Sequence, residues 1–215
     1  MPTKPAGDYE KNVFINCPFD KDYLSLLRPL LFTIVSFGFK PKIALENSDS
    51  GELRLNKICQ LIEISKYSIH DLSRLQASAK NEFYRLNMPF ELGIDYGCRR
   101  FSSAHHKQKR CLILEKGRFD FAKAISDLSG VDIKSHNNEP QALVRAVRDW
   151  FVETVKVKKA SSPTIIWYRF NEFAAEFYVK RKNEGFRDDD VNMMPVPEYI
   201  DFIQKWLRAN PKTKP

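Results

Sequence analysis

The sequence predicts an α/β protein, a three-layer fold in which helices cover both faces of a parallel sheet. Short apolar runs typical of buried strands lie at 12–17, 39–45, 67–72 and 111–114. They alternate with segments at 22–37, at 53–64 and from 89 onward, whose apolar residues recur at the helical period. Right-handed crossovers join such strands and give a parallel sheet. With 215 residues, 43% of them hydrophobic, the chain can bury a full core.

Proline and glycine mark several ends of these elements. Pro18 ends the first strand and Gly38 ends the first helix, while Pro29 inside that helix predicts a kink or a late start. Further along, the pattern predicts a short helix at 119–126, a short edge strand at 131–133 and an amphipathic helix at 140–157, with Pro140 in its first turn. Together these elements predict a flavodoxin-like domain over 12–158.

The ends of the chain differ from this domain. Residues 1–11 form a polar tail, and 159–215 form a C-terminal helical extension with helices expected at 165–182 and 198–209, joined by an acidic, solvated turn at 188–190. Two helices cannot make a core alone, so they must pack on the main domain or on a second subunit. The first of them carries more aromatic surface than one helix usually buries, which predicts a homo-oligomer with 164–209 at the contact. Simple packing on the domain's own helices is the alternative.

Composition indicates the compartment. No apolar run reaches the roughly 18 residues that span a bilayer, and the polar N-terminus has no signal-peptide core. The four cysteines are widely spaced and lack C-x-x-C pairs, so we expect free thiols rather than disulfides or a metal site. We therefore expect a cytoplasmic protein that has no membrane contact and needs no cofactor.

The net charge of +8 is concentrated in one segment. Between Arg99 and Arg118 there are seven lysines and arginines against Glu115 alone, a local charge of +6. The part from Arg99 to Arg110 follows a helix and precedes a strand, so it belongs at the amino edge of the sheet, away from the carboxyl edge. One interpretation is that Lys107, Lys109 and Arg110 bind nucleic acid or an acidic partner protein. The alternative is that they belong to a solvated loop.

The candidate site lies at the carboxyl ends of the strands, where open parallel sheets bind their ligands. Asp71 ends the third strand, and the stretch Asn87-Met88-Pro89-Phe90-Glu91 opens the next helix. We expect Asn87 to be the N-cap and Glu91 to lie in the first turn, where the helix dipole favours a carboxylate. Gly93 and Gly97 share one face and each cost about 1 kcal/mol relative to Ala, which predicts close approach to the sheet or a neighbouring helix.

Two carboxylates without metal ligands suit cleavage of a glycosidic bond through an oxocarbenium-like transition state. We expect Asp71 and Glu91 to face one cleft, with their carboxyl groups within about 10 Å. The sequence contains no G-x-G-x-x-G, P-loop, H-E-x-x-H or G-x-S-x-G motif. The alternative is that Glu91 only stabilises its helix and Asp71 only caps a loop. His70 is expected to be structural and Cys17 a buried thiol.

Three stretches resemble nucleoside 2-deoxyribosyltransferases and TIR domains. Val13-Phe14-Ile15-Asn16-Cys17-Pro18-Phe19 looks like their opening strand, and the stretch from Ile64 to Ser73 resembles their third strand. Asn87-Met88-Pro89-Phe90-Glu91-Leu92-Gly93 is similar to the helix that carries their catalytic glutamate. The likeness covers about 12–115. Met88-Pro89-Phe90 replaces the Gly-Thr that precedes the glutamate in the transferases. This difference argues against base exchange more strongly than against hydrolysis.

The resemblance implies an N-glycosidase that cleaves NAD or a related nucleoside or nucleotide, as an effector of bacterial anti-phage defence or a toxin. It implies that Glu91 is the nucleophile or oxocarbenium stabiliser, that Asp71 orients the sugar or base, and that Cys17, Pro18 and Phe19 form the pocket wall. Further candidates for substrate binding are Arg74, Asn87 and Asp95. The alternative function is a non-catalytic module of the same fold that binds a nucleotide or a nucleic acid.

Overall fold

The computed structural model describes residues 8–46, 49–74, 86–118, 125–128 and 130–211. Its centre is a parallel sheet with the strand order β2-β1-β3-β4-β5. The strands are β1 (Asn12–Asn16), β2 (Lys40–Ile43), β3 (Tyr67–Asp71), β4 (Arg110–Glu115) and β5 (Ile133–Ser135). This is the flavodoxin-like order, and the direction of winding reverses between β1 and β3. The carboxyl ends of these two strands therefore mark the expected ligand site.

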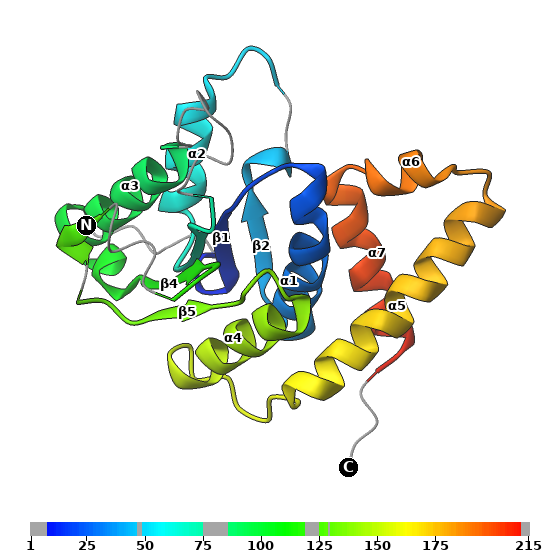
Figure 1. Ribbon diagram of the computed structural model, residues 1–215. Helices are drawn as coiled ribbons and strands as arrows, with labels where there is room; N and C mark the ends of the chain where they lie inside the picture. Colours follow the sequence, from blue (N-terminus) through cyan, green and yellow to red (C-terminus); the bar gives the residue numbers. More distant parts are fainter. Residues whose placement is uncertain (1–7, 47–48, 75–85, 119–124, 129, 212–215) are drawn as a thin grey trace.

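Helices cover both faces of the sheet, as Figure 1 shows. One face carries α1 (Leu24–Ser36) and α4 (Pro140–Glu153), and the other carries α2 (Arg54–Glu63) and α3 (Asn87–Phe101). Alternate side chains of β1 divide between the two layers, because successive residues of a strand point to opposite faces. Val13 and Ile15 join the large core under α1 and α4, whereas Phe14 packs with Ile58 and Ile62 of α2. The predicted three-layer α/β fold is confirmed.

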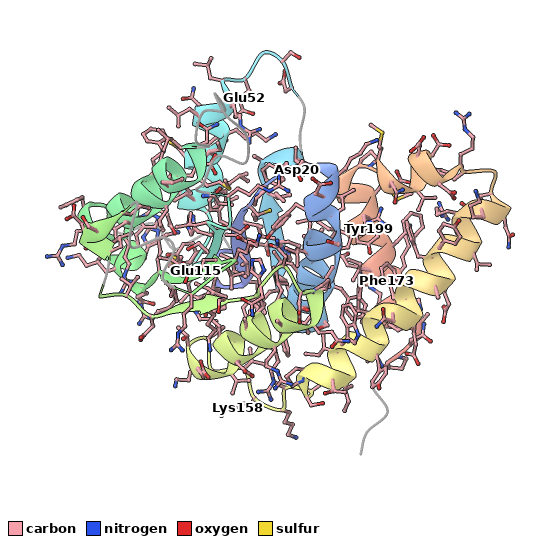
Figure 2. The ribbon with its side chains drawn as sticks, viewed as in Figure 1. Asp20, Glu52, Glu115, Lys158, Phe173 and Tyr199 are labelled. Atoms are coloured by element: carbon pink, nitrogen blue, oxygen red, sulfur yellow. The ribbon has the colours of Figure 1, made fainter. Side chains whose placement is uncertain are left out.

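The C-terminal extension shares the core of the domain. It contains α5 (Pro163–Asn183), α6 (Asp188–Asn192) and α7 (Val196–Ala209), which lie outside α1 in Figure 1. Phe173 of α5 stacks on Phe32 of α1 at 5.6 Å between ring centroids and meets the ring of Tyr199 of α7 at the same distance (Figure 2). Of the two expected alternatives, the helices pack on their own domain. The acidic run at 188–190 opens the short helix α6 and is not a simple turn.

Several element ends differ from the sequence-based prediction. A 3-10 turn over Lys21–Tyr23 precedes α1, so the helix starts two residues later than expected, at Leu24, and Pro29 lies inside it. The edge strand lies two residues later than expected, at Ile133–Ser135. Most of the helix predicted at 119–126 falls outside the described residues, and Ser126–Leu128 form a 3-10 turn. Within the described chain, no helix combines the length and apolar character needed to cross a membrane.

Candidate functional site

Asp71 is fully enclosed at the carboxyl end of β3, with 0% of its surface exposed. Its carboxylate accepts hydrogen bonds from the Tyr23 hydroxyl at 2.5 Å, from His136 Nε2 at 3.1 Å and from the Ser73 amide at 2.9 Å. Burial alone would raise the pKa of Asp71, but these three donors outweigh it and lower the pKa below its ordinary value. Asp71 is therefore an ionised and satisfied carboxylate.

The hydrogen bond at Nδ1 of His136 identifies the tautomer of this residue. The Asn138 amide donates to His136 Nδ1 at 3.0 Å, so Nε2 carries the proton that is donated to Asp71. His136 immediately follows β5, and Tyr23 precedes α1, so Asp71 joins three parts of the carboxyl edge. The prediction that Asp71 lines an open cleft is wrong for this structure, because the side chain faces Tyr23 and His136 in the core.

Glu91 has the opposite surroundings. Only 6% of the residue is exposed, yet its carboxylate has no hydrogen bond or ion pair with any residue that the structure describes. Burial raises the pKa of Glu91 to about 6, and the charge of Arg54 at the start of α2 partly offsets this. Buried polar groups are normally hydrogen-bonded, and a perturbed, unpaired carboxylate marks a candidate functional residue.

The start of α3 places Glu91 beside the other site residues. The Asn16 side chain, at the end of β1, donates through Nδ2 to the Met88 carbonyl at 2.8 Å and so ties the first turn of α3 to the sheet. The N-cap is Leu86 rather than Asn87, and no acidic residue lies in the first turn. The prediction that the helix dipole stabilises Glu91 is therefore wrong, because Glu91 is one turn further in.

A second buried network holds the middle of α3. Asp95, which the sequence analysis proposed for substrate binding, is buried and accepts hydrogen bonds from Ser68 Oγ at 2.5 Å and from His70 Nε2 at 3.1 Å. Since Asn16 Nδ2 donates to His70 Nδ1 at 3.0 Å, Nε2 must be the protonated nitrogen. Burial opposes the ionisation of Asp95, but His70, Lys109 and Ser68 together lower its pKa. The structural role expected for His70 agrees with these contacts.

Lys109 belongs to this network and not to an exposed basic loop. Its ammonium lies 3.0 Å from Asp95 Oδ1 and donates to the carbonyls of Ile62, at 2.7 Å, and Ser65. Lys107 and Arg110 are exposed beside it at the amino edge of the sheet, where the sequence placed them. The set of basic residues available to an acidic partner is therefore smaller than predicted.

The remaining candidates lie around Cys17. The thiol is buried, and burial together with the charges of Asp71 and Glu91 raises its pKa well above the ordinary value, which disfavours a nucleophilic thiolate. The charges of both carboxylates thus act on the same thiol. Pro18 is buried next to it, and the half-buried Phe19 ring has the Arg54 guanidinium 6.0 Å from its centroid.

Arg74 and Asn87 border this region in different ways. Arg74 forms a two-pronged ion pair with Asp20, at 2.5 Å and 2.8 Å, which ties the end of β3 to the loop before α1. Asn87 is exposed at the first position of α3. Arg54, Tyr23 and His136 are site residues that the sequence analysis missed.

Three donor atoms on His70, Asp95 and Cys111 lie within 4.8 Å of one another, a spacing that a metal ion could use. However, the Lys109 ammonium already occupies the Asp95 carboxylate, and burial raises the pKa of Cys111 to about 12, so the thiol is protonated. This donor set does not suit a cation.

Comparison with models of known families, with curated proteins and with solved structures finds no match to the chain.

Proposed function

We propose that this protein is an N-glycosidase that hydrolyses the bond between C1′ of a ribose and a nucleobase, with Glu91 as the carboxylate that acts at C1′. The observation that carries the proposal is the contrast between three buried carboxylates of one region. Asp71 and Asp95 have several hydrogen-bond donors or cations beside them and lowered pKa values, whereas Glu91 is buried, unpaired among described residues and has a pKa of about 6. The resemblance of its helix to that of the nucleoside 2-deoxyribosyltransferases supports the same role.

The proposed reaction follows from this charge state. The C1′–N bond breaks with its electron pair leaving on the base, and the ionised Glu91 stabilises or captures the oxocarbenium ion at C1′. Water then attacks C1′ and loses a proton. At neutral pH most Glu91 is ionised, because its pKa is about 6. The reaction uses water and no bound cofactor.

The state of Asp71 bears on the choice of substrate. A neutral purine or pyrimidine leaves more easily when an acid protonates it, but Asp71 is ionised and has three hydrogen-bond donors around it. The nicotinamide of NAD needs no such acid, because its ring nitrogen is already positive and the base leaves neutral. This favours NAD over simple nucleosides. Depletion of NAD would fit the defence or toxin role that the resemblance implies.

In this proposal Asp71 and Asp95 are positioning residues. Asp71 holds Tyr23 and His136 at the carboxyl edge, and Asp95 holds α3 through His70 and Lys109. Phe19 and Arg54 are the side chains proposed to meet the base and an anionic group, since the Arg54 guanidinium lies 6.0 Å from the Phe19 ring, its charge acts on Glu91, and both residues are accessible from solvent.

The test is to incubate the purified chain with NAD, nucleotides and nucleosides and to follow base release by chromatography. Nicotinamide and ADP-ribose should appear in equal amounts, and Glu91→Gln should lower the rate by at least about 100-fold, the scale of losing one transition-state contact. Glu172→Gln, on the exposed side of α5, is the matched control and should retain the rate. NAD binding without turnover, unaffected by Glu91→Gln, would instead identify a non-catalytic nucleotide-binding module.

A further inference from the structure

The side of α3 that points away from the sheet is mainly apolar, with Arg100 also exposed on it. Leu86 is 67% exposed, Phe90 58%, Tyr96 56% and Phe101 83%. A helix on the surface of a single subunit normally has polar residues on this side and apolar ones toward the core. In α3 two carboxylates, Glu91 and Asp95, lie among the inward residues instead. An apolar outer face of this kind marks a contact surface.

Two glycines at the middle of the same face make no close contact with the described part of the chain. Gly93 and Gly97 lie four residues apart between Phe90 and Phe101, and a Cβ built on either one meets no atom of the described residues within 4 Å. The predicted close approach to the sheet or to a neighbouring helix is therefore wrong. Since Gly weakens a helix relative to Ala, two outward glycines are explained best by a helix that approaches from outside.

A groove lies beside this face, on the side of α3 toward β4 and β5. A cavity of about 1020 Å³ lies between α3 and the segment around β5, with Leu92 and Tyr96 on one wall and Leu128 and Val131 on the other. Its rim carries charges of both signs, Arg99 and Arg110 together with Asp127 and Asp132. The surface thus combines a protruding aromatic ridge, an apolar groove and balanced charge. A surface with such complementary parts can pair with a second copy of itself about a two-fold axis.

The exposed area is sufficient for a dimer. If a whole aromatic side chain buries about 200 Å², the four exposed residues offer roughly 500 Å² per copy. Two copies would then bury roughly 1,000 Å², the lower limit for a specific interface, before the groove is counted. We propose that the protein forms a two-fold symmetric homodimer through the outer face of α3, in which the two helices cross at Gly93 and Gly97 and the aromatic ridge of each copy covers the groove of the other.

This surface differs from the one expected at 164–209. Phe170, Phe173 and Phe177, which motivated that expectation, are buried against their own domain. The outer side of α5 still exposes Ile165, Tyr168 and Val179, but the charged Glu172 lies among them. Tyr168→Ser therefore serves as a matched control for loss of an exposed aromatic residue.

The test measures mass by light scattering and sedimentation between 1 and 100 μM for the full chain. The wild type should approach twice 25.1 kDa, and Phe90→Ser and Phe101→Ser should each raise the dimer Kd at least tenfold, whereas Tyr168→Ser should not change it. Both copies carry a charge of +8, so raising the salt concentration should strengthen an apolar dimer by screening. An assembly held together by nucleic acid would dissociate instead.

The double variant Gly93→Ala/Gly97→Ala gives two effects of opposite sign. At a concentration where the protein is monomeric, its thermal midpoint should rise by roughly 4–8 °C, because Ala favours the helix. Its dimer Kd should nevertheless rise at least tenfold, because the added methyl groups keep the helices apart. A wild type that stays monomeric at 100 μM would overturn the proposal. So would a dimer that tolerates the alanines and both serine variants.

Discussion

The unpaired charge of Glu91 should make the folded protein less stable at neutral pH, and replacing it with Gln should remove that cost. The pKa of the carboxyl is about 6 in the folded chain against an ordinary value of 4.5. At 1.36 kcal/mol for each pH unit, this difference sets an upper limit of about 2 kcal/mol of unfolding free energy, which solvent screening lowers. Gln keeps the size of the side chain and lacks the charge.

The sign depends on pH. Between pH 4.5 and about 6 the folded chain keeps the Glu91 proton while the unfolded chain loses it, so the stability of the wild type falls over this window and the loss is complete above it. Glu91→Gln should therefore match the wild type at pH 4 and exceed it by up to about 2 kcal/mol at pH 8. For a chain of this size, that gain is roughly 4–8 °C in Tm.

Urea unfolding at pH 4, 5, 6, 7 and 8, followed by tryptophan fluorescence, measures the effect. Glu172→Gln, which removes an exposed carboxylate from α5, should stay within about 0.5 kcal/mol of the wild type at every pH. The reasoning would be refuted by a Glu91→Gln variant without a gain at pH 8, or with an equal gain at pH 4. In the proposed reaction, the rate of base release should fall below pH 6 as Glu91 takes up its proton.

Three further substitutions test the network and the core. Lys109→Met should destabilise the fold by about 3–5 kcal/mol, because Asp95 is left as a buried charge, and a change below 1 kcal/mol in urea unfolding would contradict the ion pair. Tyr23→Phe should cost about 1–3 kcal/mol through the lost bond to Asp71, and an unchanged urea midpoint would contradict that bond. Phe173→Ala should cost about 3–5 kcal/mol if α5 shares the main core, and a neutral result by thermal melting would mean that the extension folds separately.

The sequence allowed the layers of the fold to be predicted, because strand and helix periods alternate cleanly from Asn12 to Leu114. The strand order and the association of α5 with Phe32 depend on contacts between distant segments, which no local period reveals. Helix ends were less accurate. Asn87 has the residue type of an N-cap, yet the helix begins there without a side-chain cap, since Asn16 already anchors its first turn.

The candidate site was predicted in part. The residue types at the carboxyl ends of β1 and β3 indicated where the site lies, but they could not show that Asp71 is enclosed. Its enclosure depends on His136, which is distant in sequence and follows an edge strand whose position was displaced by two residues. The available signal for His136 was its position three residues after the strand predicted at 131–133. Lys109 was misplaced for a related reason, because the burial of a charged side chain depends on the partner it finds.

The composition of α3 connects the two proposals. Few apolar residues, mainly Met88 and Leu92, hold the inner side of this helix to the sheet. The bond from Asn16 to the first turn and the Asp95 contacts further along therefore fix the position of the helix at two points, with Glu91 between them. These two anchored points hold the Glu91 carboxylate in place, where it stays unpaired among the described residues. A second copy of α3 packed against the outer face would restrict the helix from the other side, so the proposed dimer would hold Glu91 in place more firmly than the monomer does.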